Sequence, residues 1–489
     1  MKMRIIALVV LAVMLLGMFA GCAQPNTNPT NPPATNGNGE NVGNFIVPEG
    51  GYDGSAVTIN FYHTMGANLR EVLDAYIVEF NKLYPNITIK HDQTGSYDDV
   101  RDQISKEIIA GNQPNIAYCY PDHVAMYNAA EAVATLDDLI ASTIEITRAD
   151  GTKEILGLTD AQKNDFIEGY YNEGKQFGDG LMYTMPLSKS TEVLYYNKTF
   201  FTENKIPVPT TWDELEQVCA QIKAIDPNSI PLGYDSESNW FITMCEQLKS
   251  PYTSASGDHF LFDNETNRAF VERFNGWYQK GYLTTQTLLG KYTSNLFVAA
   301  KPEKPEEIWV RSYMSIGSSA GATHQRPAMV NGEYPFEVGI ATIPQADPNN
   351  QKVISQGPSL CIFQKDNPQE VIASWLFVKF LTTTVEFQAE FAIASGYVPV
   401  LKSVAEHPIY KAELDSADGF NHITALSAKV CLDQADFYYT SPAFVGSSVA
   451  RSQVGSLISS CLSFSGSNVA DQIAAAFQDA IDECIYQAG

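Results

Sequence analysis

The sequence predicts an α/β protein of two lobes, each a mostly parallel sheet flanked by helices. The first observation is that strand-like runs of β-branched and aromatic residues alternate with amphipathic helical segments along the chain. The second is that helix start and stop signals bound several of these segments. The third is length, because one sheet cannot absorb about 430 residues when domains usually hold roughly 100–250.

The first lobe is predicted to begin with three strands separated by two helices. In the first helix, Leu69, Leu73 and Tyr76 recur at helical spacing, and Pro85 follows its end. Gly111 terminates the second helix. Strands and helices in this order favour a doubly wound parallel sheet. The expected strands are 57–62, 87–89 and 115–120, and the expected helices are 69–83 and 98–110.

The rest of the folded chain contains further strands and helices at wider spacing. Thr211-Trp212-Asp213-Glu214 has the pattern of a capping box, which predicts a helix from there to about residue 224. Trp212, at the start of that helix, is interpreted as structural. The other expected strands are 193–196, 336–343 and 359–363, and the other expected helices lie within 260–281, 368–383 and 469–485.

The N-terminus has the features of an export signal. Lys2 and Arg4 precede a nearly unbroken apolar run over 5–16, too short to span about 30 Å of hydrocarbon comfortably. Ala20-Gly21-Cys22 resembles a bacterial lipobox, whose cysteine is acylated and becomes the new N-terminus. We therefore predict a lipoprotein signal peptide over 1–21, with ordinary secretion as the alternative. Residues 22–54, rich in Pro, Asn and Thr, are predicted to be the lipidated Cys22 and a disordered tether.

Composition and spacing argue against several functions. The chain has 31 Lys+Arg against 56 Asp+Glu, a net charge of −25, which repels phosphate backbones and makes nucleic-acid binding unexpected. The cysteines beyond Cys22 are scattered without a C-x-x-C pair, so they are expected as small apolar core residues. The seven histidines lack metal-ligand spacing and no P-loop or EF-hand pattern occurs, so neither a metal nor a cofactor is expected.

A series of short motifs occurs in order between about residues 57 and 403. The longest is Met185-Pro186-Leu187-Ser188-Lys189-Ser190-Thr191-Glu192-Val193-Leu194-Tyr195-Tyr196-Asn197-Lys198. The others are at 61–66, 95–97, 110–116, 209–215, 357–360 and 395–400. Together they resemble extracellular solute-binding protein family 1, the sugar-binding and glycerol-3-phosphate-binding capture subunits of ABC importers.

This resemblance implies a type II periplasmic-binding-protein-like fold, with the ligand cleft between two lobes. The chain would cross between the lobes near 186–190, 311–319 and 357–360. Lobe 1 is then expected to hold 55–186 and about 315–357, and lobe 2 about 187–314 and 358–489. Ligand would close the lobes by hinge rotation, and the permease would recognise the closed form. The family implies a monomeric binding protein and not an enzyme.

Aromatic residues are the candidate platforms for a sugar or polyol, whose C–H groups pack on ring faces. By resemblance, Tyr97 and Tyr397 fall where glycerol-3-phosphate binders hold their ligand with tyrosines. Trp240 falls near a stacking tryptophan. For Tyr62 and Tyr120, core packing is the favoured interpretation.

Polar residues complete the predicted site. Ser318 and Ser319 would open a helix, whose free N–H groups accept anions or hydroxyl oxygens. By resemblance, Asp122 lies one position from a polyol-binding glutamate, and Arg451 lies close to a phosphate-pairing arginine. If Arg451 lines the cleft, its planar fork favours a phosphorylated ligand; otherwise a neutral sugar is favoured. The remaining candidates are Ser190 and Gly357.

The expected function is that of a lipid-anchored, extracytoplasmic receptor that passes a carbohydrate to an ABC permease. The same role with glycerol-3-phosphate or a glycerophosphodiester is the alternative. Two other classes stay open. Gly317-Ser318-Ser319-Ala320-Gly321 matches the G-x-S-x-G elbow of α/β hydrolases, with Ser319 as nucleophile and His324, His407 or His422 as a partner. A surface adhesin would need no hinged cleft.

Overall fold

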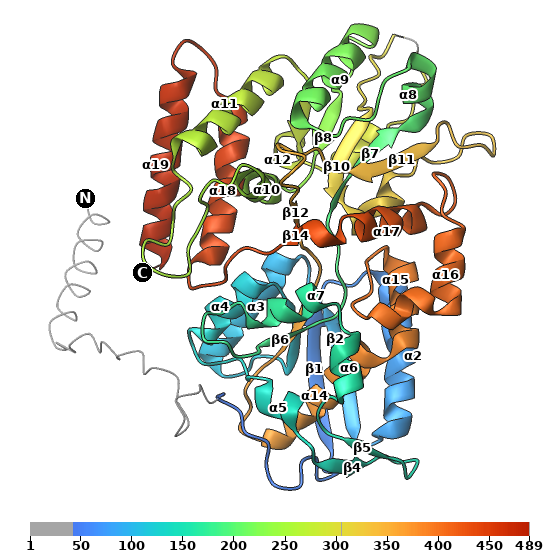
Figure 1. The fold of residues 1–489 in the computed structure, drawn as a ribbon, viewed down its shortest axis with the longest axis vertical. Helices are drawn as coiled ribbons and strands as arrows, with labels where there is room; N and C mark the ends of the chain where they lie inside the picture. The colour runs from blue at the N-terminus through green and yellow to red at the C-terminus, as the bar shows by residue number, and fades with distance from the viewer. Residues whose placement is uncertain (1–42, 305, 489) are drawn as a thin grey trace, which may run out of the picture. The chain divides into compact units, whose positions relative to one another are not determined.

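The computed structural model describes residues 43–304 and 306–488 (Figure 1). The predicted signal peptide and the predicted lipidation site Cys22 lie outside the described residues. From Gly43 onwards the chain forms one compact unit, in which two lobes are each built on their own five-stranded sheet. The two-lobed α/β architecture predicted from the sequence is confirmed.

The lobe-1 sheet has the order β2 (Ile87–Gln93), β1 (Val57–His63), β3 (Ile116–Cys119), β13 (Ser359–Ile362) and β6 (Thr184–Pro186). β1 pairs in parallel with β2 and β3, as the strand–helix–strand pattern predicts. β13 runs antiparallel to both β3 and β6. The sheet is therefore mixed, because a strand from late in the chain is inserted between two early ones.

Helices pack around the lobe-1 sheet. α2 (Ala67–Leu83) packs against α14 (Pro368–Thr383) and α15 (Val385–Ser395), and Figure 1 shows the orange α14 returning beside the blue β1. α3 (Tyr97–Ala110) begins at a capping box of Ser96 and Asp99 and ends at Gly111, whose φ is +72°. The shorter elements are α4 (Pro121–Asn128), α5 (Asp137–Ala141), β4 (Glu145–Thr147), β5 (Lys153–Ile155), α6 (Asp160–Asp165), α7 (Glu168–Asn172), η1 (Glu173–Lys175) and η3 (Lys402–Glu406).

The lobe-2 sheet has the order β11 (Val338–Thr342), β7 (Glu192–Asn197), β10 (Met314–Ser318), β8 (Leu232–Tyr234) and β9 (Leu283–Thr285). β7 is antiparallel to both of its neighbours, whereas β8 is parallel to β10 and β9. This sheet is also mixed, so the expectation of mostly parallel sheets holds only within the runs β2-β1-β3 and β10-β8-β9.

The lobe-2 helices include the one that the capping box predicts. α9 (Trp212–Ile225) starts where the Thr211 side chain accepts from Glu214 N, and Trp212 is buried in the core. α18 (Ser447–Leu462) packs on α10 (Glu237–Gln247), α11 (Glu265–Gln279) and α19 (Val469–Ala488), which brings the C-terminal helices against the middle of the chain (Figure 1). The shorter elements are α8 (Lys198–Asn204), α12 (Gln286–Leu289), α13 (Ser294–Phe297), η2 (Ser319–Gln325) and η4 (Ala435–Phe437).

In the described chain, three segments connect the lobes. Residues 187–191 join β6 to β7, and residues 355–358 join β12 (Val353–Ile354), which pairs with β14 (Tyr438–Tyr439), to β13. The third connects α16 (Pro408–Asp415), packed on α15, to α17 (Ile423–Asp433), packed on β11 and η2. The first two segments run side by side, since Ser190 and Gln356 exchange backbone hydrogen bonds of 2.9 and 2.8 Å. They form the hinge.

Strand pairing corrects the lobe assignments expected after the first crossing. β10 and β11 fall within 315–357, which was assigned to lobe 1, yet they extend the lobe-2 sheet. β13 falls within 358–489, which was assigned to lobe 2, yet it lies in the lobe-1 sheet. The segment 311–319 is likewise not a crossing, because β10 lies within one sheet. Local periodicity predicts that a strand exists, but long-range pairing decides which sheet it joins.

The end of the predicted tether packs against lobe 1. Asn44 Nδ2 donates to Val133 O at 2.7 Å, and its Oδ1 accepts from Thr135 N at 2.8 Å. Phe45 is buried in the lobe-1 core. The expected disorder is therefore wrong for residues 43–54, whereas residues 22–42 lie outside the described part.

No helix of the described residues has both the length and the apolar composition needed to cross a membrane. Their cysteines are all buried and unbridged, as expected for small apolar core residues: Cys119, Cys219, Cys245, Cys361, Cys431, Cys461 and Cys484.

Candidate ligand-binding site

A cleft of about 1050 Å³ lies between the two lobes. Its walls come from the start of α3, the start of α4 and the turn after α15 in lobe 1, and from the β8–α10 loop, η2 and α18 in lobe 2. Ligands of open α/β sheets bind at the carboxyl ends of strands, where several of these segments begin. The predicted site residues that line the cleft are Tyr97, Asp122, Ser190, Ser318, Tyr397 and Arg451.

Stacked tyrosines form part of the lobe-1 wall. The Tyr97 and Tyr120 ring centroids are 4.4 Å apart with 19° between the planes, and Tyr118 continues the stack 6.2 Å from Tyr97. Burial raises the pKa of Tyr97 well above its usual value, so its hydroxyl stays protonated. That hydroxyl faces the hydroxyls of Tyr120 and Tyr397. The wall thus offers ring faces and a group of tyrosine hydroxyls, and Tyr120 lines the cleft instead of the core.

Tyr397 is held next to the hinge by the backbone on either side of it. Gly396 ends α15 with φ of +73°, and Tyr397 N donates to Ser395 Oγ at 3.1 Å. On the other side, Val398 exchanges backbone hydrogen bonds of 2.9 and 2.6 Å with Lys189 of the first crossing segment. A movement of the hinge would therefore displace the Tyr397 ring.

Arg451 reaches from α18 of lobe 2 to the lobe-1 wall. Its guanidinium carbon lies 5.9 Å from the Tyr120 ring centroid, and its Nη2 donates to Asn239 Oδ1. Burial opposes its charge, but the nearby Asp122 carboxylate and surrounding tyrosines outweigh burial and raise its pKa. The arginine ion pairs of the described chain form elsewhere, and none involves Arg451. The guanidinium is thus fully charged and has donors left for a ligand.

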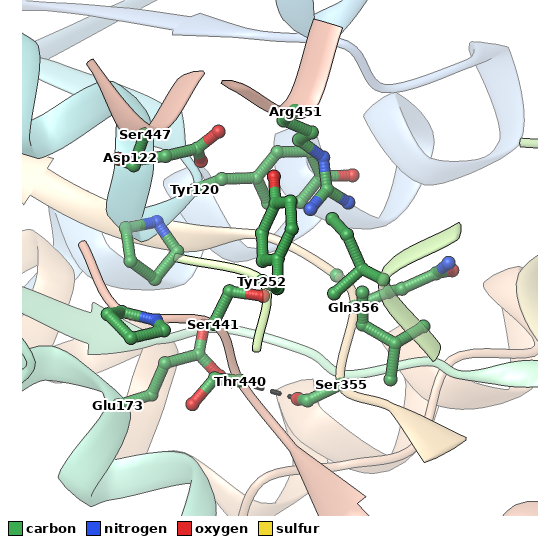
Figure 2. Close-up of a pocket in the computed structure, with 15 residues that line it drawn as sticks. Tyr120, Asp122, Glu173, Tyr252, Ser355, Gln356, Thr440, Ser441, Ser447 and Arg451 are labelled. Carbon is green, nitrogen blue, oxygen red and sulfur yellow. Dashed lines mark hydrogen bonds between the residues drawn. The ribbon is translucent and has the colours of Figure 1, made fainter. Parts of the chain in front are cut away.

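A recess of about 50 Å³ adjoins the cleft beside Arg451 (Figure 2). It shares Tyr120, Asp122 and Arg451 with the cleft, and Figure 2 shows the Tyr252 ring standing beside the Arg451 guanidinium. The Tyr252 hydroxyl and Asp122 Oδ2 are buried without a hydrogen-bond partner among the described residues. Buried polar groups are normally bonded, so these two favour a polar ligand group or water at this end of the cleft.

Small hydroxyls line the cleft where the hinge meets lobe 2. Ser318 Oγ lies 3.5 Å from Ser190 Oγ, and it also accepts from Ala320 N at 3.3 Å. Ser318 therefore opens the helical turn η2, as predicted. Gln356, from the second hinge segment, lines both the cleft and the recess.

Arg101 joins the two lobes directly across the cleft. Its Nη1 donates to Ser448 Oγ of α18 at 3.2 Å. It also pairs with Asp98 and Asp102, each at 2.8 Å, so its charge is already balanced within lobe 1. Arg101 therefore connects the two lobes, and its charge is not free to bind an anionic ligand.

The lobe-2 wall carries two carboxylates immediately after β8. Asp235 Oδ1 accepts from Thr293 N at 2.9 Å, and Glu237 Oε1 accepts from Thr287 N at 2.7 Å. Burial and, to a smaller extent, the neighbouring Glu237 raise the pKa of Asp235, and the hydrogen bonds from Thr293 offset only part of that rise. Each carboxylate is thus fixed by a backbone N–H group.

Three predicted site residues do not line the cleft. Trp240 is fully buried and stacks on Tyr234 at 4.6 Å, because this position of α10 faces the lobe-2 core. Ser319 is also fully buried, and its Oγ accepts from Thr191 N at 3.2 Å instead of facing a ligand. Gly357 lies at the small recess in the hinge, where its φ is +97° and a Cβ would lie 2.5 Å from Ser188 O. Its role there is to let the two hinge segments approach.

The hydrolase alternative loses its nucleophile for the same reason. The Ser319 hydroxyl accepts from the backbone N–H of Thr191, and no hydrogen bond among the described residues links it to a histidine.

Tyr62 lies outside the cleft, where its hydroxyl donates to Glu107 Oε1 at 3.3 Å. The described residues contain no cluster of His, Cys, Asp or Glu suited to a metal ion.

Several cleft residues were not among those predicted. The run from Asp235 to Asn239 could have been found, because five polar residues directly after a strand mark its carboxyl end. The others carry no comparable signal, since their place depends on how distant segments meet. They are Arg101, Tyr252, Tyr292, Gln325, Gln356 and Ser448.

A fold of two α/β lobes joined by paired crossing segments, with a polar and aromatic cleft between them, defines a hinged solute-binding protein. The chain belongs to the bacterial extracellular solute-binding protein family, whose profile matches residues 75–416.

One curated relative is similar to this chain in sequence, and three solved structures are similar to it in fold. The chain is 26% identical over 361 residues to the sn-glycerol-3-phosphate-binding periplasmic protein UgpB of Escherichia coli K12, covering 71% of this chain and 75% of that protein. The GacH receptor of Streptomyces glaucescens superposes with a TM-score of 0.67 at 16% identity, covering 88% of this chain and 99% of that one. UgpB of Mycobacterium tuberculosis, solved with glycerophosphocholine, superposes with a TM-score of 0.66 at 16% identity over the same shares. Maltose-bound MalE3 of T. maritima superposes with a TM-score of 0.65 at 17% identity, covering 88% of this chain and all of that one.

Proposed function

We propose that this protein is the lipid-anchored receptor of an ABC importer and that it captures a phosphorylated polyol of the glycerol-phosphate type. The observation that carries the ligand class is Arg451, a charged guanidinium in the cleft without an ion-pair partner among the described residues. A phosphate accepts two parallel hydrogen bonds from such a fork. Similarity to glycerol-3-phosphate-binding relatives supports the same class.

The remaining cleft residues suit the polyol part of such a ligand. Tyr97 and Tyr120 offer ring faces for C–H groups, and the unpaired Asp122 Oδ2 would accept from a ligand hydroxyl. Binding changes the populations of open and closed lobes, and no bond is made or broken. The permease would then read the closed form.

A neutral oligosaccharide is the second candidate, and the size of the cleft favours it. A volume of about 1050 Å³ far exceeds what a three-carbon phosphate fills. The tyrosine wall and the serine-lined hinge would suit several sugar rings. The two candidates differ in their need for Arg451.

Calorimetric titration of Arg451→Ala with glycerol 3-phosphate, a glycerophosphodiester and maltose tests the ligand class. We expect a loss of about 10- to 100-fold for the phosphorylated ligands, because hydrogen bonds to charged groups contribute about 1.5–3 kcal/mol. Arg326→Ala is the matched control, since that guanidinium also lies over a tyrosine ring, at 5.7 Å from the Tyr334 centroid, but outside the cleft. If the folded Arg451→Ala protein binds the phosphorylated ligands as tightly as the wild type does, and both proteins bind maltose, the sugar candidate is favoured instead.

The anchor is proposed from the lipobox-like Ala20-Gly21-Cys22 and the apolar run before it. Cys22→Ala is expected to abolish incorporation of labelled palmitate. Ser55→Ala, beyond the predicted tether, serves as the control and should keep that incorporation. Palmitate incorporation into the Cys22→Ala protein at the wild-type level would contradict acylation of Cys22.

A further inference from the structure

The lobe-2 wall of the cleft holds negative charge that no basic residue of the described chain balances. Asp235 is 9% exposed and Glu237 is 7% exposed, and neither takes part in a salt bridge among the described residues. Their hydrogen-bond donors are the neutral backbone N–H groups of Thr293 and Thr287. Buried charges are normally paired, so a cationic group of a ligand would be stabilised at this wall.

The two arginines that line the cleft are engaged elsewhere. Arg101 is balanced by Asp98 and Asp102. Arg451 is bonded to Asn239, and the groups that raise its pKa are Asp122 and tyrosines. The cleft therefore has a positive end at Arg451 and a negative wall after β8.

Gln325 provides an independent indication that this wall binds a hydrogen-bond donor. It is 3% exposed and lines the cleft, and its Nε2 donates to Ser315 Oγ at 3.1 Å. Its Oε1 is buried without a partner among the described residues. A Cβ built on Gly317 would lie 3.4 Å from Asp235 Oδ2 and 3.9 Å from Gln325 Nε2, so the two side chains flank the same glycine. An acceptor left unbonded there requires a donor.

Tyr292 adds an aromatic surface to the same part of the cleft. Its side chain is 62% exposed and lines the cleft near the loop that carries Thr293. An exposed aromatic face attracts cations through its quadrupole. Two carboxylates, an amide oxygen and a ring face together match an ammonium group, which has donors and no acceptor.

We propose that Asp235 and Glu237 form a subsite for an ammonium group on the ligand, so that the protein prefers amino-bearing ligands to their neutral counterparts. This inference rests on the proposed function, because it assigns a binding site to a second polar group of the captured solute. The same chemistry occurs in glycerophospho-amino alcohols and in amino sugars.

The probes are two pairs that differ in the ammonium group: glycerophosphoethanolamine with glycerol 3-phosphate, and the glucosamine disaccharide with cellobiose. Each is titrated into the purified protein and into the Asp235→Asn/Glu237→Gln double variant. Asn and Gln keep the oxygens that accept from Thr293 and Thr287, so the variant removes charge and preserves the backbone contacts. Glu203→Gln, which removes an exposed carboxylate of α8 outside the cleft, is the control.

We expect the ammonium member of one pair to bind at least tenfold more tightly than its neutral partner and to lose that advantage in the double variant. The pair that shows it identifies the source of the amine. Equal affinity within both pairs, or an equal loss for neutral and ammonium ligands in the variant, would overturn the subsite while glycerol 3-phosphate binding keeps the proposed function. If none of the four probes binds the wild-type protein, the proposed function falls and the subsite falls with it.

Discussion

At the scale of the residue, Glu192 shows how far burial in this fold shifts the pKa of a single carboxyl group. It begins β7 and is fully buried, and the Tyr234 hydroxyl donates to its Oε2 at 2.7 Å. Burial raises its pKa from 4.5 to about 8, and the hydrogen bond from Tyr234 opposes that rise without cancelling it. Near neutral pH, the folded protein therefore favours the uncharged acid.

A pH dependence of stability follows from this shift. The folded pKa lies above the unfolded one, so the stabilisation is complete below about pH 4.5 and is lost as pH rises to about 8. Relative to Glu192→Gln, the free energy of unfolding of the wild type should fall over that window by at most about 1.4 kcal/mol per pH unit. Urea unfolding of both proteins between about pH 5 and 8 measures the difference. Glu203→Gln on the exposed face of α8 should follow the wild type, and parallel profiles for all three proteins would contradict the assignment to Glu192.

At the scale of the element, the buried ion pair of Lys189 and Glu173 connects the hinge segments to lobe 1. Lys189 Nζ lies 2.7 Å from Glu173 Oε1, with both side chains almost fully buried, and it donates to Ser359 Oγ at 3.2 Å. Ser355 of the second hinge segment donates to Glu173 Oε2 at 3.4 Å. One carboxylate thus contacts both crossing segments, so the pair is expected to fix the hinge geometry.

Removing one partner of this pair should leave a buried, unbalanced charge. Lys189→Met is expected to destabilise the protein by about 3–5 kcal/mol, whereas the double variant Lys189→Met/Glu173→Gln should recover a large part of that loss. A double-mutant cycle by denaturant unfolding measures the coupling. The exposed pair Lys153–Glu145, at 3.1 Å, is the matched control and should give a coupling of at most about 1 kcal/mol. A hinge coupling no larger than the control would mean that the pair does not stabilise the hinge.

The elements also show what local sequence patterns can predict. α9 begins where its capping box predicts and α3 ends at Gly111 as predicted, because these signals act within one or two turns. The prediction that Trp240 lines the cleft is wrong, because the direction of a side chain on α10 depends on what packs against that helix. Asp235 and Glu237 follow a strand of three residues, so the polar run after that strand, and not a periodic pattern within it, is the local signal for their place in the cleft.

At the scale of the whole molecule, the division into two lobes follows from chain length and the alternation of elements, but the lobe boundaries do not. β10, β11 and β13 are ordinary apolar strands, and nothing in their sequences distinguishes the two sheets. Their pairing depends on contacts over more than one hundred residues for β10 with β7, and for β13 with β3. The cleft inherits this dependence, because Arg101, Gln356 and Ser448 line it only through the meeting of distant segments.

The two lobes are expected to close on the ligand, and the contacts across the cleft indicate how this closure can be measured. Arg101 bonds to Ser448 and Arg451 lies over Tyr120, so a ligand between these groups would tie α18 to α3 and α4. Spin labels on cysteines at Ile109 of lobe 1 and Tyr486 of lobe 2, which are 89% and 82% exposed, would report the inter-lobe distance. The native cysteines of the described chain are buried and should not be labelled under native conditions.

Saturating ligand is expected to change the mean distance between the labels at Ile109 and Tyr486 and to narrow its distribution, because a hinged receptor populates the closed state when ligand binds. Labels at Ile109 and Lys82, both in lobe 1, form the control pair and should report no change. Glu173→Gln, which weakens the lock between the hinge segments, should broaden the distribution of the ligand-free protein. If ligand binds by calorimetry while both distance distributions stay unchanged, capture occurs on a rigid cleft, and the permease must recognise the ligand or a local change at its edge instead of lobe closure.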